Sequence, residues 1–348
     1  MHYAGIAWSG QGFEVAVLDA DGAPATPPAH FPAGSVAALI DALRAMDRPE
    51  RPLVCVVEST NGMVDGGLMA AGLRVHRADP WVLPTRPVFG SVDAGTLARA
   101  AVTRLPELTR LVLEDGSLTG RSADHARGVR DSETALRALT SSGRCLAHGE
   151  RGGDTAGDKV IALTFDDGPN PPWTGRILDV LERYGVPATF FCVGLHASAH
   201  TEELARMAEA GHGFGNHTWS HPFLPDLSER ELALQLERTD EAIAQAGGSP
   251  KRRLFRPPYG SRSPEVLSWL AAGDGPSVVL WDADSGDWAM PGADVIARSV
   301  LEQARPGSIA LMHDGGGDRS QTAEALPAVI EGLLADGYRF TLVEEMLP

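Results

Sequence analysis

Apolar and polar positions along the C-terminal half of the chain follow two periods, one typical of buried strands and the other of amphipathic helices. Glycines that can end a helix follow several of the helical segments, as at Gly185, Gly211, Gly247 and Gly337. The predicted strands are 160–165, 189–193, 278–281, 308–312 and 339–342, and the predicted helices are 174–183, 201–210, 229–245, 264–271, 293–304 and 322–335. This regular alternation predicts an α/β fold with a largely parallel sheet.

The N-terminal part has a different order of elements. The pattern predicts a hairpin of strands 3–8 and 12–18, followed by helix 36–46, strand 53–58, helix 63–71, strand 73–77 and helix 93–104. The stretch 114–157 is polar and rich in Gly, Ser and Arg, with weak helical periodicity over 123–139. Because 348 residues leave room for two domains, we expect a smaller α/β domain at 1–113, a linker with one helix at 114–157, and a second domain at 158–348.

Candidate chemistry is concentrated after the apolar run 160–165. Asp166 and Asp167 follow this predicted strand, and His217 and His221 come about fifty residues later. One carboxylate with two imidazoles is a ligand set for a divalent metal, and the second carboxylate is then free to act as a general base. Each motif alone is weak, since an acidic pair before Gly-Pro is also a good turn sequence. Two histidines four apart would project to the same side of a helical turn.

Three further stretches strengthen this interpretation. They are Arg256-Pro257-Pro258-Tyr259-Gly260, Trp281-Asp282-Ala283-Asp284-Ser285-Gly286-Asp287-Trp288 and Leu311-Met312-His313-Asp314. Together with the first two motifs, and in the same order, they closely resemble the polysaccharide deacetylase family, also called the NodB-homology or carbohydrate esterase family 4 domain. The resemblance covers about residues 158–348 and implies a distorted (β/α) barrel with fewer than eight complete units.

The resemblance also implies roles for individual residues. Asp167, His217 and His221 would bind one divalent metal, and Asp166 would be the catalytic base that activates a water molecule. Zinc is the expected metal, although cobalt, nickel and manganese suit the same donors. Tyr259 would supply a backbone N–H that stabilises the tetrahedral oxyanion.

The remaining implied roles concern proton transfer and the acyl pocket. His313 would protonate the leaving amine, and Asp287 would contact His313 and raise its pKa. Arg256 would pair with Asp166 and hold it ionised. Trp288 and Leu311 would wall a small apolar pocket for the acetyl methyl group, although apolar residues beside strands are core by default. Asp314 is expected to be a loop or supporting group, one that orients a metal ligand or contacts His313 and does not act on the substrate itself.

These residues predict a metal-dependent N-deacetylase acting on an N-acetylated sugar. The motifs specify amide chemistry better than they specify sugar, so another C–N hydrolase or small-molecule deacylase on the same scaffold is an alternative. Nothing in the sequence encodes the oligomeric state.

The N-terminal part resembles, over about 110 residues, the RNase H-like domain of DEDD-type insertion-sequence transposases. The resemblance rests on Gly5-Ile6-Ala7-Trp8-Ser9, on 57–62 and on 93–98. That family uses acidic residues to bind two magnesium ions. Glu58 and Asp93 are present, but Ala7 occupies the acid position of the first strand, which should cripple two-metal chemistry. We therefore expect a degenerate domain that serves structure, partner binding or substrate capping.

Charge argues against a third class, a nucleic-acid-associated protein led by the N-terminal domain. The formal net charge is −16, and the only two lysines, Lys159 and Lys251, are far apart in the sequence. Nucleic-acid binding draws much of its affinity from cationic contacts, so such a partner is disfavoured while a neutral N-acetylated sugar is compatible.

Targeting signals give one more expectation. Residues 1–30 lack a basic stretch followed by an apolar one, and no run is long enough to span a bilayer, so no membrane partner is expected. The three cysteines, Cys55, Cys145 and Cys192, do not indicate a disulfide framework. We expect a cytoplasmic protein.

Overall fold

The computed structural model of the chain describes residues 1–149, 159–248 and 252–347. It divides into two compact units. The first comprises Met1–Arg127 together with Ser220–Gln235, and the second comprises Gly128–Trp219 together with Leu236–Pro348.

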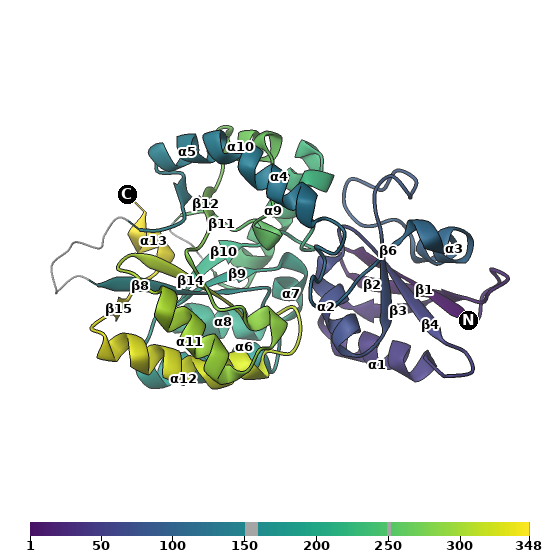
Figure 1. Cartoon of the computed structure of the whole chain (residues 1–348), viewed down its shortest axis with the longest axis horizontal. Helices are drawn as coiled ribbons and strands as arrows, with labels where there is room; N and C mark the ends of the chain where they lie inside the picture. The colour runs from purple at the N-terminus through teal and green to yellow at the C-terminus, as the bar shows by residue number, and fades with distance from the viewer. Residues whose placement is uncertain (150–158, 249–251, 348) are drawn as a thin grey trace. The chain divides into compact units, whose positions relative to one another are not determined.

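The first unit is a mixed sheet with helices (Figure 1). Its elements are β1 (His2–Ser9), β2 (Gly12–Leu18), β3 (Ala29–Pro32), η1 (Ala33–Ser35), α1 (Val36–Met46), β4 (Leu53–Glu58), α2 (Gly62–Ala70), β5 (Arg74–Ala78), α3 (Ala94–Arg104), η2 (Leu105–Glu107), β6 (Thr109–Arg110) and, from the later segment, η3 (Leu224–Asp226). The strand order is β3-β2-β1-β4-β5-β6. β1 pairs with β2 antiparallel and with β4 parallel, and β4 pairs with β5 parallel.

The core of the first unit lies between its central strands and α3. Val54 and Val56 of β4 pack with Leu97 of α3 in one buried cluster. Gly5 of β1 permits this packing, because a Cβ at that position would lie 2.0 Å from the Ala94 carbonyl oxygen. α3 itself begins with Asp93, whose carboxylate accepts a hydrogen bond from the Thr96 N–H, the usual way to satisfy a helix N-terminus.

The second unit is built from alternating strands and helices. Its elements are α5 (Glu133–Ser141), β7 (Cys145–Leu146), β8 (Val160–Asp166), α6 (Trp173–Tyr184), β9 (Thr189–Cys192), α7 (Gly194–Ala199), α8 (Thr201–Glu209), β10 (Gly213–Asn216), β11 (Leu254–Phe255), η4 (Pro258–Gly260), α10 (Pro264–Ala271), β12 (Ser277–Val279), β13 (Ala283–Asp284), η5 (Asp287–Ala289), α11 (Ala293–Gln303), β14 (Ser308–His313), α12 (Ser320–Ala335), β15 (Arg339–Phe340) and α13 (Val343–Met346). Two helices, α4 (Ser122–Asp131) and α9 (Glu229–Gln245), run across the division between the units.

The strands of the second unit form one parallel sheet. Their order among the described residues is β13-β14-β8-β9-β10-β11-β12-β7, and β15 also pairs with β8. Every pairing in this sheet is parallel, which gives a parallel half-barrel, the distorted (β/α) barrel that was expected. β8 is buried along most of its length and lies next to β14 and β9, so its C-terminal end is surrounded by other strand ends.

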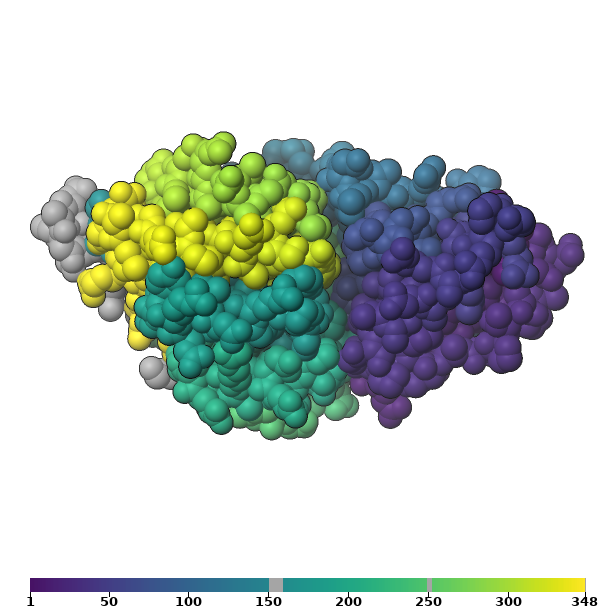
Figure 2. Space-filling model, turned by 90° about the horizontal axis from the view of Figure 1, so that it is seen from below, coloured from purple at the N-terminus to yellow at the C-terminus, as the bar shows by residue number. Residues whose placement is uncertain are grey.

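Helices cover the outside of this sheet. α12 packs against α11 on one side and against α6 on the other, and α6 packs against α8. Figure 2 shows this layer, with the yellow α12 between the lime-coloured α11 and the teal α6. No helix in the described ranges is long and apolar enough to cross a membrane.

The stretch 114–157 differs from the linker that the sequence predicts. Its described part holds two helices, α4 and α5, where one was expected, and the strand β7. β7 pairs with β12, so the second sheet takes up a strand before residue 158. Cys145 lies in this strand and is buried, a position that the polar composition around it does not indicate. Residues 150–157 of the predicted linker, and residue 158 after it, lie outside the described residues.

Candidate metal centre and active site

The two acidic residues lie where β8 ends. Asp166 is the last residue of β8 and is the register partner of His313, the last residue of the neighbouring strand β14. Asp167 follows at a φ of 75°, so the chain turns away from the strand direction at that residue. The C-terminal ends of parallel strands are where barrel enzymes carry their active sites.

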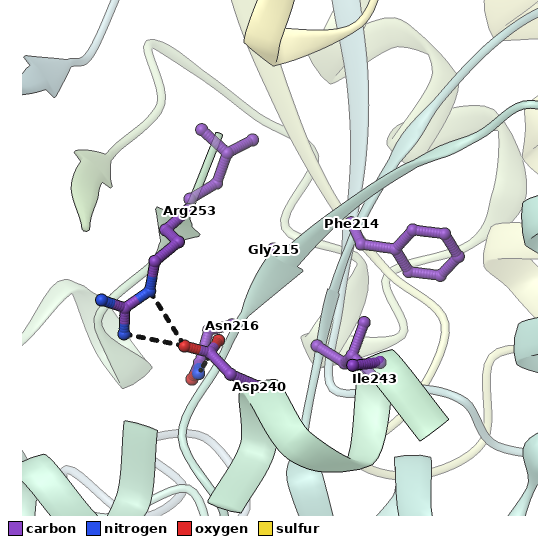
Figure 3. A pocket seen from close by; sticks show the side chains of 8 residues that line it. Phe214, Gly215, Asn216, Asp240, Ile243 and Arg253 are labelled. Carbon is purple, nitrogen blue, oxygen red and sulfur yellow. Dashed lines mark hydrogen bonds and ion pairs between the residues drawn. The ribbon is translucent and has the colours of Figure 1, made fainter. Parts of the chain in front are cut away.

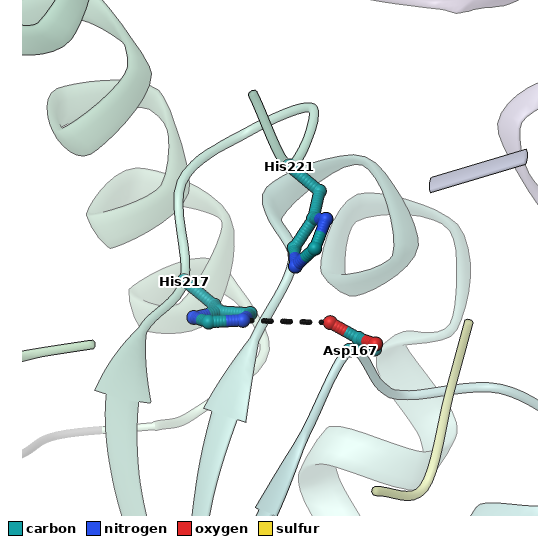
Figure 4. Close-up of side chains that lie close together, drawn as sticks. All are labelled: Asp167, His217 and His221. Atoms are coloured by element: carbon teal, nitrogen blue, oxygen red, sulfur yellow. Dashed lines mark ion pairs between the residues drawn. The ribbon is translucent and has the colours of Figure 1, made fainter. Parts of the chain in front are cut away.

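Asp167, His217 and His221 come together at this edge, as Figure 4 shows. One ligand atom from each residue lies within 4.8 Å of the others, and both histidines are buried. His217 Nε2 lies 3.4 Å from Asp167 Oδ1. A carboxylate and two imidazoles, converging in this way, fit a divalent metal and leave coordination positions for water and substrate.

A backbone contact fixes the orientation of the His217 ring. Its Nδ1 lies 2.7 Å from the carbonyl oxygen of Arg256. Because a carbonyl oxygen only accepts, Nδ1 carries the hydrogen, and the lone pair is left on Nε2, the atom that faces Asp167. Such a contact orients a metal-binding imidazole and raises its basicity.

The two histidines are not on a helical turn, the arrangement in which a spacing of four residues would place them on the same side. His217 and His221 lie in a loop after β10, and Thr218 and His221 have φ values of 67° and 56°, which no right-handed helix accommodates. The imidazoles converge because the loop curves, whereas a spacing of four residues alone suggests a helix.

Unusual backbone conformations cluster at this site. Among the described residues, Asp167, Thr218, His221, Tyr259 and Met290 are the non-glycine residues at positive φ. The first four belong to the motifs after β8, β10 and β11. Non-glycine residues adopt this region at a cost of about 1–3 kcal/mol, and such residues gather at functional sites.

Arg256 holds Asp166. Its Nη1 donates to Asp166 Oδ1 at 2.7 Å and to the Thr164 hydroxyl at 2.8 Å. The side chain is completely buried, and its guanidinium lies 4.0 Å from the centre of the Phe191 ring. Burial lowers the pKa of Arg256, and the Asp166 carboxylate opposes that shift. The expected contact between Arg256 and Asp166 is therefore present, with Asp166 3% exposed.

His313 and Asp287 form the second pair. His313 Nδ1 lies 2.6 Å from Asp287 Oδ1, while Asp287 Oδ2 accepts from the His313 N–H at 2.8 Å and from the Thr322 hydroxyl at 2.7 Å. Burial by itself lowers the pKa of His313, but the ion pair with Asp287 outweighs it and raises this pKa to about 9. Burial raises the pKa of Asp287, but the contacts with His313 outweigh burial and lower this pKa to about 2.

Two contacts that sequence reasoning missed support the metal-binding turn. Asp314, expected to be a loop or supporting group, is fully buried; its Oδ1 accepts from the Gly168 N–H at 3.1 Å and its Oδ2 accepts from the Thr174 hydroxyl at 2.6 Å. Burial raises the pKa of Asp314 to about 7, against the Thr174 hydrogen bond. His196 Nδ1 contacts the Asp167 carbonyl oxygen at 2.8 Å, so it donates there. No sequence signal links these residues, because they lie on separate elements.

Asn216 anchors the loop that carries His217. Its side-chain amide donates to the Leu236 carbonyl and to Asp240 Oδ1, both at 2.8 Å, and its Oδ1 accepts from the Thr218 N–H at 2.8 Å. Figure 3 shows Asn216 at the edge of a cavity of about 210 Å³ between β10, β11 and α9. Arg253 pairs with Asp240 at 2.8 Å beside it. The metal cluster is not among the residues that line this cavity.

The residues predicted to bind the acyl group occupy different environments. Tyr259 is half-buried at a φ of 59° in the turn Pro258–Gly260. Leu311 is buried in β14, and Trp288 is 45% exposed in the turn Asp287–Ala289. Their roles in binding an oxyanion and an acetyl methyl group stay predictions.

The fold is a parallel half-barrel, and its site holds a donor set for a divalent metal. Beside this set lie a carboxylate bound by an arginine and a histidine bound by a carboxylate. Together these features define a metal-dependent hydrolase. Comparison with known proteins identifies the family within this class. Residues 153–273 match the family model described as polysaccharide deacetylase. The chain is 38% identical over 192 residues to a peptidoglycan-N-acetylglucosamine deacetylase of Bacillus cereus, an alignment that covers 55% of this chain and 89% of the relative.

Two other matches agree. A chitooligosaccharide deacetylase of Sinorhizobium fredii is 40% identical over 192 residues, covering 52% of this chain and 89% of that protein. The crystal structure of a peptidoglycan N-acetylglucosamine deacetylase aligns at a TM-score of 0.56 and 33% identity over 60% of this chain and 95% of that one. The chain belongs to the polysaccharide deacetylase family, and the family region covers about residues 153–330.

Proposed function

We propose that this protein is a metal-dependent deacetylase that hydrolyses the N-acetyl amide of an amino sugar and releases acetate and a free amine. The observation that carries the proposal is the metal cluster of Asp167, His217 and His221 beside Asp166 and His313, which end adjacent parallel strands. Amide hydrolysis needs a base for the water and an acid for the amine, and this arrangement supports Asp166 and His313 as those two groups.

In this proposal Asp166 takes a proton from the attacking water. Arg256 donates a hydrogen bond to one oxygen of Asp166 and fixes it, so the other oxygen can accept the proton. The tetrahedral oxyanion that forms would accept a hydrogen bond from the Tyr259 N–H. His313, whose raised pKa of about 9 keeps it protonated at neutral pH, gives its proton to the leaving nitrogen. Asp287 acts through His313 by holding its ring and its charge.

Asp167, His217 and His221 would hold the metal, and zinc is the ion we propose. A divalent metal bound there supplies Lewis acidity that polarises the amide carbonyl and lowers the pKa of water. Cobalt, nickel and manganese accept the same donors. Trp288 and Leu311 are proposed to flank the acetyl methyl group.

The proposed substrate is a short N-acetylated oligosaccharide. The relatives act, by their names, on N-acetylglucosamine in peptidoglycan and on chitooligosaccharides. A net charge of −16 favours a neutral substrate over a polyanion. We also propose a cytoplasmic location, supported by the three cysteines, all of them buried and unbridged.

For the first unit we propose a degenerate RNase H-like domain without nuclease activity. The hairpin β1–β2 leads into β4 and β5, which run parallel to β1 through helical connections, and this order fits the proposal. Ala7 on β1 offers no carboxylate. Glu58 ends β4 but is engaged with Arg86 and the Val92 N–H, and Asp93 caps α3.

Amine release tests the proposed activity directly. Chelated and then zinc- or cobalt-reconstituted protein would be assayed on N-acetylglucosamine oligomers and on simple acetamides. We expect metal-restored release from the oligomers. Activity confined to non-sugar amides would favour the alternative deacylase, and no release from either class would overturn the proposal.

A further inference from the structure

The segment Ser220–Gln235, which contains the metal-cluster residue His221, belongs to the first unit, together with residues 1–127. The segment closes on itself, because the Ser220 N–H donates to Gln235 Oε1 at 2.9 Å and the Gln235 amide donates to the Ser220 hydroxyl at 3.0 Å. Two arginines from the N-terminal residues, Arg86 and Arg121, provide further contacts.

Arg121 contacts the middle of the segment Ser220–Gln235. Its Nη1 lies 2.6 Å from Asp226 Oδ2, and its Nη2 donates to Asp79. The guanidinium lies 5.0 Å from the centre of the Phe223 ring. The side chain is only 5% exposed, so this ion pair is shielded from water. Asp79 is itself fixed by Arg77 at 2.7 Å, which keeps the anchor rigid.

Arg86 contacts the same segment at the start of α9. Its Nε donates to Glu231 Oε1 at 2.8 Å, its Nη2 donates to the Asp226 carbonyl at 2.6 Å, and its Nη1 lies 3.4 Å from Glu58 Oε1. All three nitrogens of the guanidinium are therefore used. Glu231 Oε2 also accepts from the Ser228 N–H and hydroxyl at 2.7 Å, so Arg86 holds the residue that caps this helix.

On the N-terminal side, Arg86 is anchored by Glu58. Glu58 is the acidic residue that resembles a metal ligand of the transposase family, and here its two oxygens face Arg86 and the Val92 N–H. A side chain engaged with a guanidinium in a buried site is poorly placed to bind magnesium. The same position serves instead to fix an arginine.

We propose that Arg86 and Arg121 are positioning residues for the loop that carries His221, and that residues 1–127 of the first unit act as a built-in clamp on that loop. Glu58 and Asp79 are the fixed points of the clamp, and Asp226 and Glu231 are what it holds. The effect on metal binding rests on the proposed function; the hold on the segment does not.

The test uses the full chain with Arg121→Ala, Arg86→Ala and Asp226→Ala, and the double variant Arg121→Ala/Asp226→Ala. Arg127→Ala is the matched control, because Arg127 is 62% exposed and its ion pair within the described residues is with Asp124 on its own helix. Hydrogen exchange of peptides spanning 220–235 reports the hold on the segment. Zinc affinity by chelator competition reports the effect on the metal cluster, and neither measurement needs a substrate.

We expect faster exchange in 220–235 and zinc affinity weakened by about tenfold for Arg121→Ala, the range typical of residues that orient metal ligands. Both single substitutions remove the Arg121–Asp226 ion pair, so the double variant should show exchange and zinc affinity no worse than those of the worse single variant. Arg127→Ala should match the wild type. Unchanged exchange in 220–235 would overturn the proposal, as would additive effects in the double variant. Should Arg121→Ala fail to fold, Arg86→Ala and Glu231→Gln give the same two measurements.

Discussion

Asp314 Oδ1 accepts a hydrogen bond from the Gly168 N–H at 3.1 Å, and the two residues are so close that a Cβ on Gly168 would lie 1.9 Å from Asp314 Oδ2. This contact joins the turn after β8 to the end of β14. Asp167, a proposed metal ligand, immediately precedes Gly168, so the position of its carboxylate depends on a glycine and a buried acid that lie outside the metal cluster.

Gly168→Ala should therefore destabilise the protein and weaken metal binding. We expect a loss of about 1–3 kcal/mol in the free energy of unfolding, as for other overpacked sites, measured by urea denaturation with zinc affinity in parallel. Gly175→Ala is the control, because Gly175 lies in α6 with no atom near the added methyl group. That change should stabilise the helix by about 0.5–1 kcal/mol. Equal changes in stability and zinc affinity for the two substitutions would contradict the claim that close contact between Gly168 and Asp314 positions Asp167.

Asp166→Asn and Asp167→Asn should separate catalysis from metal binding. In Asp166→Asn the amide oxygen can still accept from Arg256, but the side chain cannot take a proton, so we expect kcat to fall by about 10²–10⁴-fold while metal binding is kept. Loss of the Asp167 carboxylate removes a metal ligand, so zinc affinity should fall as well. Metal content after dialysis and kcat on an N-acetylglucosamine oligomer measure both. The assignment of base and ligand fails if Asp166→Asn loses the metal and Asp167→Asn retains it.

The pH profile should report His313. The proposed acid must be protonated to act, so kcat/KM should fall as the pH rises through its pKa of about 9. Asp287→Asn removes the charge that raises this pKa, and burial then lowers it, so the alkaline limb should move to lower pH. The pH dependence of kcat/KM measures the shift. Asp294→Asn, an exposed change in α11, should leave the limb in place; an unmoved limb in Asp287→Asn would argue against His313 as the acid.

Arg256→Lys should reduce the rate without releasing the metal. Lysine lacks the planar fork that reaches Asp166, Thr164 and the Leu280 carbonyl at once. Losing a buried charge-assisted hydrogen bond costs about 1.5–3 kcal/mol, so kcat/KM should fall by about 10–100-fold. His217 contacts the backbone carbonyl of residue 256, which the substitution keeps, so zinc affinity should change little. A large loss of zinc with an unchanged rate per bound metal would contradict this interpretation.

Much of the site could be predicted because strand ends are visible in the sequence. Asp166 follows an apolar run and His313 closes another, and neighbouring parallel strands bring such ends together. The contact between Arg256 and Asp166 and the contact between His313 and Asp287 followed from the family resemblance, and both are present.

The residues that hold the ligands could not be predicted in the same way. Asp314 reaches Thr174 across 140 residues of sequence, and His196 contacts a backbone carbonyl, which carries no sequence signal. β10 was missed because Gly213-Phe-Gly-Asn216 is short and glycine-rich, which is unfavourable in a strand unless neighbouring chains approach closely. Phe191 makes that approach, lying 2.3 Å from where a Cβ on Gly215 would be.

The boundaries between the two units could not be predicted from the sequence for a similar reason. Helix α9 reads as one amphipathic helix, yet its start groups with the first unit through Glu231 and its remainder with the second. A pattern along the chain reports which face of a helix is buried, and it does not report which domain covers that face.

The most direct test of the central claim is a titration of zinc into chelated protein, with bound metal and amine release from an N-acetylglucosamine oligomer measured in the same samples. We predict that activity is absent without metal, rises in proportion to bound zinc and reaches its maximum at one ion per chain, and that His217→Ala and His221→Ala lose both. Full activity in the chelated protein, or activity in these variants without bound metal, would contradict the account.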